Sequence, residues 1–144
     1  AGILLYRTLH AHGFATRPES TSRDDGLRLR DCRITNAVKC LPPGNKPLQA
    51  ELHRCNPFLA AELAGLPENA VIVALGTVAH VAVLRAGGMK AATARFAHGA
   101  EHRLPGGRVL LDSYHCSRYN TNTRRLTPPM FDRVFARARH LLGG

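Results

Sequence analysis

One stretch of the chain decides how its fold is interpreted: DCRITNAVKCLPPGNKP, residues 31–47, with a further cysteine downstream at Cys55. Alternating apolar and basic residues from Leu27 lead into it, and this alternation predicts a strand that ends in polar residues near Asn36. A proline-rich turn follows and separates this strand from a helix. The stretch therefore indicates a strand end that delivers Asn36 and then Cys40 into a site.

Helices and strands are expected to alternate along the rest of the chain. Apolar residues recur at steps of four and three after the proline turn, which predicts a helix with one apolar face. Short continuous apolar runs are typical of buried parallel strands. The expected elements are helix 3–12 closed by Gly13, helix 48–63, strand 70–75, helix 77–86, strand 108–114 and a last helix capped by Thr127. The apolar face of helix 48–63 is expected to consist of Leu48, Leu52, Cys55, Leu59 and Leu63. The inward face of the last helix is expected to consist of Phe131, Val134, Phe135, Ala138 and Leu142.

This alternation predicts an α/β fold with a parallel sheet and helices on its faces. Ligands of such sheets bind beyond the carboxyl ends of the strands. Asn36, Gly76 and His115 all follow predicted strand ends. We therefore expect these three positions to lie at one edge of the sheet.

The charge of the chain favours a polyanionic partner. Its 144 residues include 20 Lys and Arg against 10 Asp and Glu, a formal net charge of +10. Neutralised phosphates release condensed counterions, so nucleic acid is the expected partner, with simple solubility as the alternative. No apolar run approaches the roughly 20 residues of a membrane span. We expect a cytoplasmic protein without a membrane partner.

The cysteine pattern leaves two interpretations open. No C-x-x-C pair is present, which argues against a zinc ribbon despite eight histidines. Cys40 and Cys55 bracket the proline turn and the first turns of a helix. The two residues are either thiolate ligands of one soft metal centre or small buried hydrophobic side chains.

Three polar features also have two interpretations each. Asn36 can present its amide to the edge of a base or bond the local backbone. His115, at a strand end, can donate to a developing oxyanion or serve as a structural imidazole. Arg118, Arg124 and Arg125, which are interleaved with Asn and Thr, suit phosphate contacts but also suit a solvated loop.

Several motifs occur together in one order: residues 31–47, Pro57-Phe58-Leu59 after the second cysteine, the strand that ends at Gly76, and the His115-x-Ser117 loop. In this order they resemble the iron–sulfur uracil-DNA glycosylases. The stretch SYHCSRYNTNT, residues 113–123, points to family 5, with family 4 as a near relative. The similarity spans nearly the whole chain. It implies a single three-layer α/β/α domain over residues 1–144 with a short parallel sheet.

One part of the family pattern is not found in the sequence. The chain begins at Ala1 without an initiator Met, and the Gly/Ala-Pro-Gly loop of the first strand is absent. We therefore expect residues 1–144 to be the C-terminal portion of a longer parent, with the first central strand of the sheet missing here.

The resemblance implies a monofunctional DNA repair glycosylase, which hydrolyses the N-glycosidic bond of uracil, and of other deaminated bases, to leave an abasic site. It implies that His115 stabilises the departing base and that Asn36 recognises it. Cys40 and Cys55 would be two of the four ligands of a [4Fe–4S] cluster. The partner would be damaged DNA and the intact parent a monomer. The expected DNA-binding residues are Ser117, Arg118, Tyr119, Asn120, Arg124 and Arg125.

The His115 loop departs from the family pattern in three places. Cys116 replaces a proline, Tyr119 stands where an aliphatic wedge is expected, and Arg124 stands where glycine is frequent. Two other classes of protein remain as alternatives. A non-catalytic nucleic-acid-binding module would use the basic surface alone, and a redox-sensing cysteine protein would not need Asn36.

Overall fold

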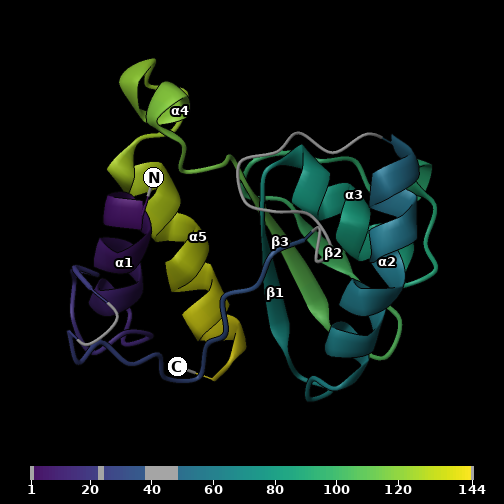
Figure 1. Cartoon of the computed structure of the whole chain (residues 1–144), viewed down its shortest axis with the longest axis horizontal. Coiled ribbons are helices and arrows are strands. Elements are labelled where there is room, and N and C mark those ends of the chain that lie inside the picture. Colours follow the sequence, from purple (N-terminus) through teal and green to yellow (C-terminus); the bar gives the residue numbers. More distant parts are fainter. Residues whose placement is uncertain (1, 23–24, 38–48, 144) are drawn as a thin grey trace. The chain divides into compact units, whose positions relative to one another are not determined.

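The computed structural model describes residues 2–22, 25–37 and 49–143, without the side chains of residues 49–54. The chain divides into two compact units, which we call the helical unit (1–35 with 113–144) and the sheet unit (36–112). Figure 1 labels the helices and strands. None of the helices in the described part of the chain is long and apolar enough to cross a bilayer.

The sheet has three strands. In spatial order they are β1 (Val71–Leu75), β3 (Val109–Ser113) and β2 (Glu101–Arg103). The N–H of Val109 donates to the carbonyl of Ala70 at 3.3 Å, so β1 and β3 begin at the same edge and run parallel. Helix α3 (Thr77–Ala86) follows β1 along the chain. The predicted α/β fold with a short parallel sheet is confirmed.

Strand β2 was not predicted from the sequence. It pairs antiparallel with β3, with Glu101 opposite Leu111 and Arg103 opposite Val109, which makes the sheet mixed. The strand has only three residues, and the side chains of Glu101 and Arg103 are exposed. Short, charged strands are common at sheet edges, where they discourage pairing with other chains. Such a strand buries no apolar face, so its sequence carries no alternating hydrophobic pattern.

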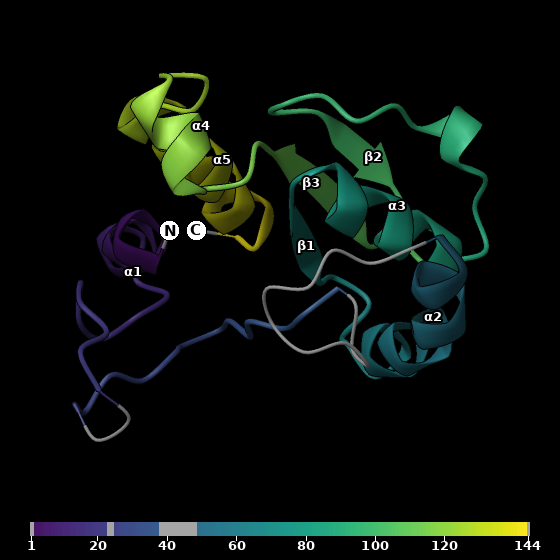
Figure 2. The ribbon, with the colours of Figure 1, turned by 45° about the horizontal axis from the view of Figure 1, so that its top comes forward.

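Helices α2 (Gln49–Ala64) and α3 pack against each other, and α3 packs against β1 (Figure 2). The core between them contains Leu59 of α2 and Leu84 of α3, both at most 1% exposed, with Leu63 packed against the cluster. The helix predicted over residues 48–63 is confirmed as α2. Leu48 and the side chain of Leu52 lie outside the described residues. Gly76 precedes α3 with a φ of 98°, a conformation that favours glycine at the turn out of β1.

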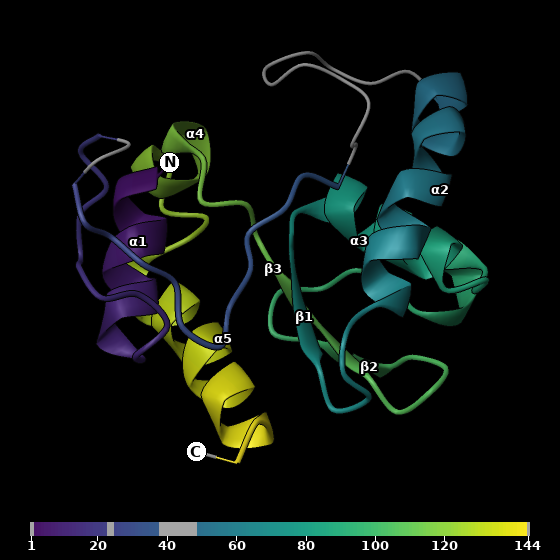
Figure 3. The same ribbon diagram turned by 60° about the horizontal axis from the view of Figure 1, so that its bottom comes forward.

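The helical unit contains α1 (Gly2–Ala11), α4 (Arg118–Asn122) and α5 (Pro128–Leu141). Helix α1 lies beside α5 (Figure 3). The hydroxyl of Thr127 caps α5 by accepting from the N–H of Met130, as predicted. Gly13 follows α1 with a φ of 77°, also as predicted. Four predicted inward residues of α5 are buried, namely Phe131, Val134, Phe135 and Ala138, while Leu142 is half-buried at the C-cap.

The predicted strand over residues 27–36 is wrong. Leu29 forms only an isolated antiparallel bridge with Ala15, and the chain has no regular structure from residue 32 to 36. Asp31 has a φ of 52°, which interrupts an extended conformation. Ile34 is 44% exposed and Leu27 and Leu29 are only half-buried, so the alternating residues do not form a fully buried apolar face. Alternation without burial does not stabilise a strand in a sheet.

Candidate active-site loop and a buried histidine–aspartate cluster

The loop that carries His115 follows directly after β3. Ser117 caps α4, since its hydroxyl accepts from the N–H of Asn120 at 3.2 Å. The side-chain amide of Asn120 donates in turn to the carbonyl of His115 at 2.9 Å. Ser117 and Asn120, predicted as DNA-binding residues, therefore also hold the loop in place. Helix α4 was not predicted, because five polar residues show no apolar periodicity.

His115 presents its imidazole at the surface of the helical unit. Partial desolvation by the surrounding chain lowers the pKa of His115 below its ordinary value. The ring is therefore neutral at neutral pH. A neutral imidazole retains one N–H donor and one acceptor, which suits it to donate a hydrogen bond to a developing negative charge.

The cations of the loop are exposed. Arg118, Arg124 and Arg125 all reach solvent, and Tyr119 is 73% exposed. The guanidinium of Arg125 lies over the ring of Tyr114, 5.7 Å from its centroid, in a cation–π contact. This geometry leaves the three arginines accessible to phosphate groups.

Asn36 is exposed and lies in a segment without regular structure. Because the strand predicted before it is not formed, Asn36 does not follow a strand end. Gly76 does follow one, since it comes directly after β1. Asn36 belongs to the sheet unit and His115 to the helical unit.

The cysteines fall into two groups. Cys55 is 1% exposed within α2 and is not among the free thiols, while Cys40 lies outside the described residues. Cys32 and Cys116 are free thiols, and burial raises the pKa of both. They therefore remain protonated at neutral pH, whereas a metal ligand must be a thiolate.

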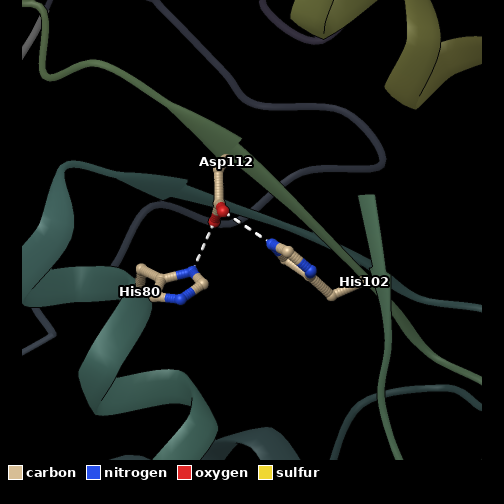
Figure 4. Close-up of side chains that lie close together, drawn as sticks. All are labelled: His80, His102 and Asp112. Atoms are coloured by element: carbon tan, nitrogen blue, oxygen red, sulfur yellow. Dashed lines mark hydrogen bonds and ion pairs between the residues drawn. The ribbon is translucent and has the colours of Figure 1, made fainter. Parts of the chain in front are cut away.

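A buried cluster of His80, His102 and Asp112 joins three elements of the sheet unit. Figure 4 shows the ring of His80, from α3, and the ring of His102, from β2, both pointing toward the carboxylate of Asp112 on β3. Nδ1 of His80 lies 2.7 Å from Oδ1 of Asp112, and Nε2 of His102 lies 2.7 Å from Oδ2. The side chain of Asp112 is 0% exposed, that of His80 3% and that of His102 14%.

The hydrogen-bond partners decide where one proton of the cluster lies. Nε2 of His80 is 2.8 Å from the carbonyl oxygen of Ala94. A carbonyl can only accept, so Nε2 of His80 must carry a proton. A second proton must lie between Nδ1 of His80 and Oδ1 of Asp112, since one of these two atoms has to donate to the other at 2.7 Å. The N–H of Ala97 also approaches Oδ2 of Asp112, at 3.5 Å, so both carboxylate oxygens are satisfied.

The cluster also has the composition of a metal site. Two imidazoles and one carboxylate offer ligand atoms within 4.8 Å of one another, a donor set that zinc accepts. However, tetrahedral zinc with bonds of about 2.1 Å holds its ligand atoms about 3.4 Å apart. The 2.7 Å separations in this cluster are those of hydrogen bonds. We therefore interpret the cluster as a hydrogen-bonded network that fixes α3, β2 and β3.

Sequence reasoning missed this cluster, although a signal was present. Asp112 interrupts the apolar run of strand 109–113, and an aspartate in a buried strand requires a partner. His80 likewise lies in the apolar segment of α3, and it is 2% exposed. The pattern therefore indicated a buried pair, but the identity of the partners depends on the tertiary fold.

The α/β fold agrees with the comparison with known proteins. The family model of the uracil DNA glycosylase superfamily matches residues 1–139. The chain is 48% identical over 143 residues to the type-5 uracil-DNA glycosylase of Thermus thermophilus, and the aligned region covers 99% of this chain and 65% of that relative. It is 44% identical over 145 residues to the type-5 enzyme of Mycobacterium leprae, covering 99% and 63%. A type-4 enzyme of Archaeoglobus fulgidus is 44% identical over 55 residues, 38% of this chain and 27% of that relative.

The chain belongs to the uracil DNA glycosylase superfamily. The similarity to type-5 members extends over nearly all of its length, and that to type-4 members is more distant, as predicted. The chain spans about two thirds or less of the length of the type-5 relatives it matches.

The buried network generates a prediction about stability. Asp112→Asn removes the negative charge that both histidines face and is expected to lower the free energy of unfolding by about 3–5 kcal/mol. Asp132→Asn is the matched control, since Asp132 contacts His12 at 2.8 Å but is 52% exposed. The control should lose less than about 1 kcal/mol. Urea unfolding of the two variants measures both changes.

The same measurement tests the interpretation as a hydrogen-bonded network. Unfolding of the unsubstituted protein is expected to keep its midpoint when a chelator of divalent metals is added. Equal losses in Asp112→Asn and Asp132→Asn, or a midpoint that falls with the chelator and returns with zinc, would contradict the network.

Proposed function

We propose that the protein is a DNA repair glycosylase that hydrolyses the N-glycosidic bond of uracil in DNA, and of other deaminated bases, leaving an abasic site. The observation that carries this proposal is 48% identity, over 99% of the chain, to a protein named as a type-5 uracil-DNA glycosylase. The reaction would be the first step of base excision repair.

His115 is proposed to act on the departing base. As the C1′–N bond breaks, its electron pair passes to the base, and water adds to C1′ of the sugar. The base leaves as an anion and later takes up a proton. Because the lowered pKa keeps the imidazole of His115 neutral, it can donate its N–H to the oxygen on which the negative charge develops.

Asn36 is proposed to recognise the base after it leaves the DNA stack. Its amide carries both donors and acceptors, and it is exposed on the sheet unit. Extrusion of a base costs a few kcal/mol and costs least for a mispaired base such as uracil opposite guanine. We propose that contacts of the loop with DNA offset this cost of extrusion. Tyr119 would act as a wedge in the duplex, and Arg118, Arg124 and Arg125 would contact the backbone phosphates.

Cys40 and Cys55 are proposed to supply two of the four ligands of a [4Fe–4S] cluster. Such a cluster is bound by thiolates, so two further ligands are needed. The burial of Cys55, at 1% exposure, suits a ligand that is shielded from water. When bound, the cluster would stabilise the fold near the DNA-binding surface. The protein is further proposed to be a cytoplasmic monomer with damaged DNA as its partner.

Glycosylase activity is tested on a duplex that contains a U·G pair, using the complete natural polypeptide that contains residues 1–144. Alkali cleavage after single-turnover reaction measures abasic product. His115→Ala is expected to slow the reaction about 10²–10³-fold, because a donor to the developing charge is lost. Asn36→Ala is expected to slow it by a similar factor, and His140→Ala, at an exposed position on α5, should leave the rate unchanged.

The outcomes separate the proposed function from its main alternative. DNA binding without any abasic product would indicate a non-catalytic nucleic-acid-binding protein. Product that forms equally well in His115→Ala and the unsubstituted protein would contradict the role of the histidine. A hypoxanthine duplex assayed in parallel shows how far activity extends beyond uracil.

Cluster binding is tested separately from activity. Cys55→Ser in the same polypeptide is expected to lose the visible absorption of the cluster and most of its bound iron, because a thiolate ligand is removed. Cys32→Ser is the control and should retain both, since Cys32 is a free, protonated thiol. Iron retained at full occupancy in Cys55→Ser would exclude Cys55 as a ligand.

A further inference from the structure

The helical unit contains a cavity, and only two of the proposed DNA-binding loop residues, Arg118 and Arg124, are among the residues that line it. It has a volume of about 540 Å³ and is lined by the start of α1, the segment around α4 and the start of α5. Its apolar wall includes Ile3 and Leu126, and three arginines also line it: Arg7, Arg118 and Arg124. None of the described residues that line it is acidic. Volumes of this size are typical of small-molecule and nucleotide sites.

The three guanidinium groups have no counter-charge among the residues that the structure describes. Among the residues that the structure describes, Arg7, Arg118 and Arg124 form no ion pair, although other arginines do, such as Arg139 with Asp31. All three are exposed. Like charges gathered around one cavity repel one another, and an anion bound there would relieve this repulsion.

The backbone of residues 128–131, at the start of α5, supplies no free N–H donor to this cavity. Pro128 and Pro129 have no N–H, and the N–H of Met130 donates to the hydroxyl of Thr127. The N–H of Phe131 donates to the carbonyl of Thr127. The start of the helix, with the positive end of its dipole, lines the cavity, and the hydrogen bonds to an anion would come from side chains, namely the arginines and the hydroxyl of Thr127.

The backbone at Arg124 gives an independent indication that its side chain is used. Its φ is 61°, in the left-handed region where a side chain is strained and glycine is favoured. Strain of this kind is often retained where the residue has a function. Arg124 lines the cavity together with Arg118 and with Arg7, which lies 117 residues earlier in the chain.

We propose that this cavity binds a backbone phosphate of DNA, with Arg7, Arg118 and Arg124 as its ligands and the adjoining sugar against the apolar wall. The arginine fork matches the paired oxygens of a phosphodiester. The inference rests on the proposed function in that it takes DNA as the partner. It adds Arg7 of α1 to the DNA-binding surface, a residue far in sequence from the loop of residues 113–125.

Arg7→Gln tests the site through the salt dependence of binding to an undamaged duplex. Each phosphate neutralised contributes about 0.9 to the slope of log K against log salt, which corresponds to about fivefold in affinity at 0.15 M salt. Arg7→Gln is therefore expected to weaken binding about fivefold and to reduce the slope by about one. Arg133→Gln, an exposed arginine of α5 that does not line the cavity, should change neither.

Arg124→Gly separates DNA binding from folding. The substitution removes both the cation and the strained side chain, so the thermal unfolding midpoint should hold or rise while the affinity for DNA falls about fivefold. If affinity and stability fall together, Arg124 serves the fold and the proposal is overturned. Unchanged affinity and slope in Arg7→Gln would also overturn it.

Further outcomes distinguish a DNA phosphate from a free phosphate ion as the ligand of the cavity. They also distinguish failure of the phosphate site from failure of the proposed glycosylase function. Inorganic phosphate that binds in an Arg7-dependent way, with the DNA affinity of Arg7→Gln unchanged, would indicate a free-anion site and overturn the proposal. A reduced slope in Arg7→Gln without any abasic product from the unsubstituted protein would support the phosphate site while the glycosylase function fails. Abasic product with an unchanged slope would refute the phosphate site alone.

Discussion

The buried carboxylate of Asp112 is the contact on which the sheet unit depends. A fully buried charge is tolerated only when its partners are in place, and here they come from α3 and β2, at 2.7 Å from each oxygen. The main chain of Asp112 adds to this constraint, since its carbonyl accepts from the N–H of Gly99 and its N–H donates to Ala100. The side chain and the backbone of Asp112 together fix the position of β3 relative to α3, β2 and the segment of residues 99–100.

The proposed catalytic loop begins in the sequence where β3 ends, and its own hydrogen bonds fix its conformation. Ser113 is the last residue of β3, and His115 follows two residues later. Ser117 and Asn120 then close the loop onto α4 and onto the carbonyl of His115. Within the helical unit, the hydroxyl of Ser117 and the amide of Asn120 thus hold the backbone of the loop that carries the imidazole. Preorganisation of this kind is what stabilisation of a developing charge requires.

Helices could be predicted from the sequence more reliably than strands and sites. Thr127 and Gly13 mark helix ends through local hydrogen bonding and backbone conformation, so their effect is visible within a few residues. The strand expected before Asn36 failed, because alternation indicates a strand only where a partner strand and a core are available. The cluster of Asp112, His80 and His102 was missed for a related reason: which buried groups meet is decided by tertiary packing. His115 and the loop arginines could be proposed as site residues because their residue types and order match a family.

The proton on Nε2 of His80 tests the account most directly, because the whole interpretation of the buried network depends on it. Nitrogen and proton NMR of the imidazole rings in the folded protein measures that proton. We predict a ring N–H at Nε2 of His80 that exchanges slowly with water, since it donates to the buried carbonyl of Ala94. An unprotonated Nε2, or a ring N–H that exchanges as fast as that of an exposed histidine, would contradict the network and the fixed position of β3 derived from it.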